Sequence, residues 1–258
     1  MFTILFGALF IGLSLGLLGA GGSIITVPLL AYAVGFSEKQ AIIGALFIVA
    51  IISGVSALLN LRNGQIHFKA VIWLSLAGIL GSGLAAGLSN WLSGEFQFIL
   101  LAAIMLLAAW RMLGKQSPLQ QHEQAGKLRL SFTGFGLGAI TGLVGVGGGF
   151  LIVPALVTLA KLPMRAAVPT SLTIIFFNAS AGIANHFAVN TQMMLNLDWK
   201  TLMIFSIVGI IGSLIGQTIA KRLPQQSLKK GFAYIILATA IGMLIHSFIQ
   251  LFNQGGFL

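Results

Sequence analysis

The sequence predicts an all-α integral membrane protein made of two homologous halves, and three observations support this fold class. Hydrophobic residues make up 57% of the 258 residues and charged residues only 7%, which is too little polar surface to cover a soluble globule. Several apolar runs exceed the roughly 20 residues that span a bilayer core. The segment GLLGAGGSIITVPLL at 16–30 returns as GLVGVGGGFLIVPAL at 142–156, which indicates an internal duplication.

Eight apolar segments follow one another along the chain. They run at about 2–33, 40–61, 70–92, 96–113, 130–160, 166–188, 200–220 and 231–252. The stretch 114–129 between the fourth and the fifth has the turn formers and charges of a solvated linker. We therefore expect a first repeat at 1–113, a polar cytoplasmic linker at 114–129 and a second repeat at 130–258, with four apolar segments in each repeat.

The positive charges predict how the segments cross the membrane. If all eight cross, the 14 Lys and Arg residues divide seven to seven, against the rule that they gather in cytoplasmic loops. If the first segment of each half turns back at its glycines, only Lys39 and Lys200 remain on the outer side. Each half then has one re-entrant or discontinuous segment and three crossings, an odd number, so the halves form an inverted repeat. We expect a multi-pass protein of the bacterial inner membrane with both termini outside.

The glycine breaks predict an anion site. Backbone N–H groups cannot remain unpaired in lipid, so a break is tolerated where it is buried in protein or faces a polar cavity. A half-helix that begins there directs free N–H groups and the positive end of its dipole at the cavity. Near the membrane midplane we expect a small anion to bind the backbone of Gly19, Gly21, Gly22, Ser23, Gly145, Gly147, Gly148 and Gly149. Pro28 either begins the second half-helix or kinks a longer one.

Polar side chains inside the apolar segments are further candidates for substrate binding. They are Ser56 and Asn60 in the second segment, and Thr170, Ser171, Asn178, Asn185 and His186 in the sixth. Buried hydroxyls and amides in a membrane either line a solute path or join helices, and His186 could carry a proton or cap its helix. We expect Gly78, Gly81, Gly83, Gly87, Gly209, Gly212 and Gly216 to serve close helix packing instead.

Several function classes are not supported by the sequence. All four acidic residues fall at segment ends or in loops, so coupling to protons or sodium through a carboxylate at membrane depth is not expected. No phosphate-binding loop, GxSxG or HExxH motif and no cysteine is present, so we expect neither an enzyme nor a cofactor or metal site. The net charge of +10 is dispersed over short loops, which favours a role in topology over nucleic-acid binding. The expected partners are a small anion and the lipid bilayer, with the chain a monomer or a homodimer.

Particular motifs resemble a known family. GLLGAGG and GLVGVGG, each followed by VP, the TSL at 170–172 and the DWK at 198–200 resemble the sulfite exporter TauE/SafE family, which includes transporters like the 4-toluene sulfonate uptake permease. This resemblance covers about residues 5–250 and implies transport, usually export, of small sulfur-containing anions. In the first half GAL at 44–46 replaces TSL, and Asn60 stands where the second half has His186. We therefore expect an asymmetric site with more polar contacts from the second half.

Together these observations predict a secondary transporter. It would export sulfite, thiosulfate, sulfoacetate or another organosulfonate by alternating access. An anion channel or uniporter, and a carrier for a non-sulfur organic anion, are the alternatives.

Overall fold

The computed structural model describes residues 2–20, 22, 26–27, 29–61, 64–89, 94–114, 126–144, 149–189 and 197–255, and all the regular secondary structure in them is helical. The elements are α1 (Phe2–Leu18), a π-helical turn η1 (Leu29–Val34), α3 (Glu38–Leu61), α4 (Phe68–Ser89), α5 (Gly94–Leu113), α6 (Lys127–Val144), α7 (Gly149–Thr158), α8 (Met164–Val189), α10 (Trp199–Arg222) and α11 (Gln225–Gly255). The predicted all-α class is confirmed.

Four helices in the described residues are long and apolar enough to cross a membrane. They are Gln40–Leu61, Phe68–Ala85, Met164–Ala184 and Trp199–Arg222, with mean hydropathies between 1.4 and 2.7. These four correspond to the second and third predicted segments of each half. Large apolar side chains such as Leu80 and Ile207 are exposed on them, as expected for helices that face lipid. The chain is a multi-pass membrane protein.

The first segment of the first half breaks after α1, as predicted, whereas the residues between α6 and α7 in the second half lie outside the described part of the chain. Helix α1 ends at Leu18, and Gly19 follows with a φ of +75°, a conformation in which a Cβ atom would be strained. In the second half α6 ends at Val144 and α7 begins at Gly149. Pro154 lies inside α7, whereas its counterpart Pro28 lies outside the described residues.

The chain reverses its direction after α1. A Cβ atom on Gly22 would lie 2.5 Å from Cγ of Leu15 and 2.7 Å from the carbonyl oxygen of Ile11, so Gly22 packs back against α1. Further along, the side chain of Leu29 would lie 2.7 Å from a Cβ atom on Gly7, near the start of α1. The first segment therefore follows a hairpin course and returns to the end of the bundle from which it starts.

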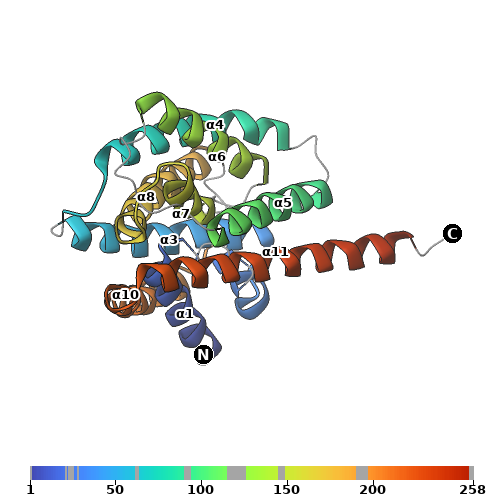
Figure 1. The fold of residues 1–258 in the computed structure, drawn as a ribbon. Helices are drawn as coiled ribbons and strands as arrows, with labels where there is room; N and C mark the ends of the chain where they lie inside the picture. Colours follow the sequence, from blue (N-terminus) through green and yellow to red (C-terminus); the bar gives the residue numbers. More distant parts are fainter. Residues whose placement is uncertain are drawn as a thin grey trace.

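Glycines bring two pairs of helices into backbone contact. Helix α1 packs along α10 and α6 packs along α4, each pair running in the same direction, and α4 and α6 lie side by side in Figure 1. A Cβ atom on Gly12 would overlap the carbonyl group of Gly209, and one on Gly138 would overlap that of Gly78. Close packing is thereby confirmed for Gly78, Gly81, Gly209, Gly212 and Gly216. The same prediction was wrong for Gly83, which faces open space, and the packing of Gly87 is outside the described part.

The packing of the two halves is reciprocal. The first helix of each half packs on the third long helix of the other half, α1 on α10 and α6 on α4. Helices α3 and α8 are antiparallel, because Gly54 lies beside Phe176 while Gly182 lies beside Leu46. Helices α5 and α11 also pack together, and the C-terminal end of α11 extends beyond the rest of the chain in Figure 1. In that view the α4–α6 pair and the α1–α10 pair lie on opposite sides of α3 and α8.

The start of α10 is held by a side-chain cap. The Asp198 carboxylate accepts hydrogen bonds from the Thr201 hydroxyl at 2.6 Å and the Thr201 backbone N–H at 3.2 Å. These bonds, the one from the hydroxyl first, lower the pKa of Asp198 below its ordinary value. A lowered pKa stabilises the fold above the ordinary pKa of the carboxyl group, and this contribution is lost as the pH falls through the lowered value.

Removing this cap should have a small effect that depends on pH. We expect Asp198→Ala to lower the Tm in detergent at pH 7 by about 2 °C. The difference from the wild type should shrink below about pH 4, where the carboxyl group of the unfolded chain takes up a proton while the folded form still holds it ionised. Thermal unfolding followed by tryptophan fluorescence between pH 3 and pH 7 measures it. A difference that stays constant down to pH 3 would contradict the role of the ionised carboxylate.

Candidate functional site

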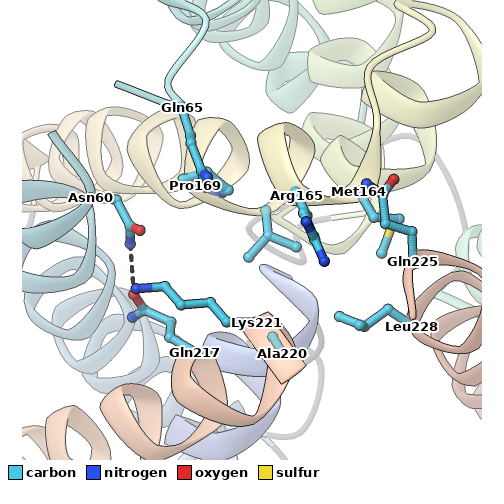
Figure 2. A pocket seen from close by; sticks show the side chains of 12 residues that line it. Asn60, Gln65, Met164, Arg165, Pro169, Gln217, Ala220, Lys221, Gln225 and Leu228 are labelled. Carbon is cyan, nitrogen blue, oxygen red and sulfur yellow. Dashed lines mark hydrogen bonds between the residues drawn. The ribbon is translucent and has the colours of Figure 1, made fainter. Parts of the chain in front are cut away.

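A cavity of about 300 Å³ lies where α3 and α10 end and α8 and α11 begin. It is lined by segments from both halves (Figure 2). The residues that line it are Gly16, Asn60, Gln65, Met164, Arg165, Val168, Pro169, Gln217, Ala220, Lys221, Gln225 and Leu228. Its volume is at the lower end of the range for small-molecule sites.

An amide and hydroxyl network forms one wall of this cavity. Asn60 donates from Nδ2 to Oε1 of Gln217 at 2.6 Å and to the carbonyl oxygen of Ser56 at 2.8 Å. One turn deeper, the hydroxyls of Ser56 and Ser213 lie 2.8 Å apart, and Nε2 of Gln217 donates to Oγ of Ser213 at 3.2 Å. The spacing of four residues on both helices places these pairs on facing stripes. The network joins α3 of the first half to α10 of the second.

The cavity is electrostatically positive. Arg165 on α8 and Lys221 on α10 project into it from different walls (Figure 2). None of the described residues that line it carries a carboxylate. Of the four acidic residues, Glu38 and Asp198 lie at the ends of α3 and α10 that are remote from the cavity. The length of these helices puts both carboxylates about 30 Å from it. At that distance salt screens the interaction between exposed charges. This arrangement attracts anions.

The cavity adjoins the first glycine break. Gly16 lines it, and so does Val168, whose Cα would lie 3.0 Å from a Cβ atom on Gly19. Gly16 packs on Ser213 of α10. The turn at Gly19 therefore lies beside the last third of α10, and it is nearer to the cavity than to the centre of that helix. A chain reversal with a positive φ, which favours glycine, therefore lies beside a positively charged pocket.

Comparison with known proteins identifies the family. The sequence profile described as "Sulfite exporter TauE/SafE" matches residues 4–243. The chain belongs to this family. A probable membrane transporter protein of Xylella fastidiosa (strain Temecula1 / ATCC 700964) is 30% identical over 249 residues, covering 93% of this chain and 94% of the relative. This confirms the family that the motifs had indicated.

More distant relatives carry similar descriptions. The probable membrane transporter protein MJ0441 of Methanocaldococcus jannaschii is 25% identical, covering 91% of this chain and 90% of its own. The probable membrane transporter protein YunE of Bacillus subtilis is 29% identical over 203 residues, covering 66% of this chain and 72% of its own. No solved structure matches. The protein is a TauE/SafE-family membrane transporter.

Two predicted site residues of this TauE/SafE protein join its halves. Ser171 is fully buried and its hydroxyl donates to the carbonyl oxygens of Gly19 at 2.9 Å and Val168 at 2.7 Å. The Thr170 hydroxyl, also fully buried, accepts a bond of 3.1 Å from the backbone N–H of His67. Both contacts match the helix-joining alternative for these residues, and Ser171 fixes the carbonyl group of the first break against α8.

Asn178 lies elsewhere in the protein. It lines a second, much smaller cavity of about 20 Å³ together with Gly78, Gly138 and Ile152. Its side-chain oxygen is buried and has no hydrogen-bond partner, which is uncommon for a buried polar atom. A space of this size holds at most one water molecule. The structure therefore does not bring Asn178 together with Asn60.

The remaining predicted residues divide into two groups. Gly22 and Gly149 are described and buried, Gly22 against α1 and Gly149 at the start of α7. The other backbone candidates Gly21, Ser23, Gly145, Gly147 and Gly148 lie outside the described residues, as do the side chains of Asn185 and His186.

Sequence reasoning missed five polar residues of the cavity, Gln65, Arg165, Gln217, Lys221 and Gln225. A signal was present for one of them. Ser213 and Gln217 repeat the spacing of Ser56 and Asn60, so two stripes of the same kind could have been paired. Arg165 and Lys221 were counted only as loop charges, because nothing in the chain order shows that the start of α8 meets the end of α10.

Proposed function

We propose that this transporter exports a small sulfur-containing anion, such as sulfite, thiosulfate, sulfoacetate or another organosulfonate, and that the cavity is where the anion enters from the cytoplasm. The observation that carries the proposal is a pocket that holds Arg165 and Lys221, lacks a lining carboxylate and adjoins the Gly19 break. The TauE/SafE description of the matching family supports sulfite or a related anion as the cargo.

The direction of export rests on the distribution of charge. The helix ends around the cavity carry Arg165, Lys221 and Arg222, and positively charged ends face the cytoplasm in bacterial membrane proteins. An inside-negative potential of about 100 mV favours outward movement of one negative charge by about 2.3 kcal/mol. Export of an anion therefore needs no other source of energy. In this orientation the protein lies in the inner membrane with both termini outside.

We propose that the two halves form an inverted repeat that works by alternating access. The reciprocal packing supports this proposal. The equivalent helices α3 and α8 are antiparallel, so they run in opposite directions. In addition, α1 is parallel to α10, and α6 is parallel to α4 in the same way. Inverted halves can exchange conformations and so expose one site to either side. Backbone N–H groups at the glycine breaks, the first at Gly19 to Ser23 and the second at Gly145 to Gly149, would then hold the anion in transit. Both halves line the cavity, so one chain suffices for a complete site.

Counterflow in proteoliposomes tests this function. Vesicles that contain the purified protein and unlabelled sulfite or thiosulfate should take up the same labelled anion transiently above its equilibrium level, and the rate should saturate. Filling the cavity by Ala220→Trp should abolish the uptake, because Ala220 lines it. The matched variant Ile219→Trp changes the neighbouring exposed residue on α10 and should transport as the wild type does.

The other outcomes distinguish the alternatives. Flux that neither saturates nor shows counterflow would indicate an anion channel, since a uniporter, like other carriers, saturates and shows counterflow. Saturable counterflow of lactate or another carboxylate, with none for any sulfur-containing anion, would indicate a carrier for a non-sulfur organic anion. Equal transport by the Ala220→Trp variant would refute the role of this cavity.

A further inference from the structure

The cavity contains two positive charges that come from separate elements. Arg165 lies in the first turn of α8, whereas Lys221 lies in the last turn of α10. Figure 2 shows the guanidinium group of Arg165 in the space between the two helices and the Lys221 side chain extending toward the side on which Asn60 and Gln217 lie. The two groups therefore offer two places for negative charge.

The surroundings leave both cations available to a ligand. The described residues that line the cavity include no Asp or Glu, and both Arg165 and Lys221 are exposed. An anion with one charged group can approach only one of them closely. A second anionic group on the same ligand can approach the other cation and gain a further favourable Coulomb interaction.

The rest of the lining suits carbon atoms between two such groups. Met164, Val168, Ala220 and Leu228 line the same cavity, and burial of apolar ligand surface against them is favourable. The volume of about 300 Å³ is in the range of sites for organic ligands. A bare oxyanion would leave the apolar walls uncovered.

We propose that the cavity selects organic dianions, in which two anionic groups are joined by a carbon chain, over monoanions of the same kind. Arg165 binds one anionic group and Lys221 the other, and the apolar walls contact the carbon chain. The proposal rests on the proposed function, since it assumes that this cavity admits the transported anion.

Matched pairs of anions test the proposal on the whole protein in detergent. Propane-1-sulfonate is compared with propane-1,3-disulfonate, and butyrate with glutarate, by calorimetric titration at constant ionic strength. In the wild type we expect each dianion to bind about tenfold more tightly than its monoanion partner. In Lys221→Gln or Arg165→Gln the ratio should fall to about one to three, because only one cation remains.

A matched variant controls for a general loss of positive charge. Lys200 lies on the same helix as Lys221 but at its other end and is also exposed, so Lys200→Gln should retain the full preference for dianions. Equal binding of monoanions and dianions by the wild type, or an unchanged ratio in both cavity variants, would overturn the proposal while leaving anion transport in place. If none of these anions binds and counterflow of sulfur-containing anions is also absent, the proposed function itself fails.

Discussion

Replacing Gly138 with alanine is expected to prevent α6 from packing on α4. The added Cβ atom would overlap the carbonyl group of Gly78, and a helix backbone cannot yield as a flexible side chain can. Because α4 and α6 form one of the two most extensive helix contacts between the halves, we expect a loss of about 3 kcal/mol of stability and a fall in Tm of about 10 °C. Thermal unfolding of the purified variant, together with its elution profile in detergent, measures the effect.

Gly136 on the same helix provides a control in which alanine should not lower the stability. A Cβ atom on Gly136, two residues earlier, meets no atom within 4 Å. Alanine is a better helix former than glycine, so Gly136→Ala should leave the stability unchanged or raise it by up to about 1 kcal/mol. If Gly138→Ala is as stable as Gly136→Ala, backbone contact between α6 and α4 does not hold the halves together.

Replacing Gly19 with alanine should disrupt the first break and with it the cavity. The φ of +75° is unfavourable for alanine, and the new Cβ atom would lie 2.5 Å from Oγ of Ser171 and 3.0 Å from Cα of Val168. Since Val168 lines the cavity, we expect a Tm lower by several degrees and the loss of most anion binding and counterflow. Differential scanning calorimetry and the proteoliposome assay measure the two effects.

The variant Gly35→Ala is a control that distinguishes the effect of backbone strain from the effect of disrupting the cavity. It has a φ of +83°, but a Cβ atom there meets nothing within 4 Å. Gly35→Ala should therefore cost only the backbone strain of about 1–2 kcal/mol, with transport retained by the protein that remains folded. Equal loss of transport in both variants would show that strain alone, and not the packing of Gly19 on α8, explains the effect.

Much of the fold could be predicted because it depends on properties that recur along the chain. Apolar length predicted the helices, and the duplicated glycines predicted a break in the first segment, where α1 ends at Leu18. The glycine spacing also predicted close packing, although it could not separate Gly81, which contacts α6, from Gly83, which faces open space. Both glycines lie on one helix, and only the position of the neighbouring helix distinguishes them.

The candidate site was predictable only in part. Asn60 stood out as an amide in an apolar segment, and the structure places it in the cavity wall bonded to Gln217. Ser171 stood out as a hydroxyl in an apolar segment, but it donates a hydrogen bond to the carbonyl oxygen of Gly19 in the other half. Hydroxyls and amides serve helix packing and solute binding equally well, so residue type alone cannot assign the role.

Hydropathy was sufficient to predict the membrane setting and the helical class, and the repeated glycine segment predicted a duplication with a break in each half, since each of these follows from a local stretch of chain. Which cations meet depends instead on the tertiary fold. Arg165 and Lys221 are more than fifty residues apart, and they share a cavity because α8 starts where α10 ends. That meeting depends on the packing of α1 on α10 and of α3 on α8, through contacts between distant residues. A local sequence pattern does not indicate which distant residues it will contact, and for this reason the cavity could not be predicted from the sequence.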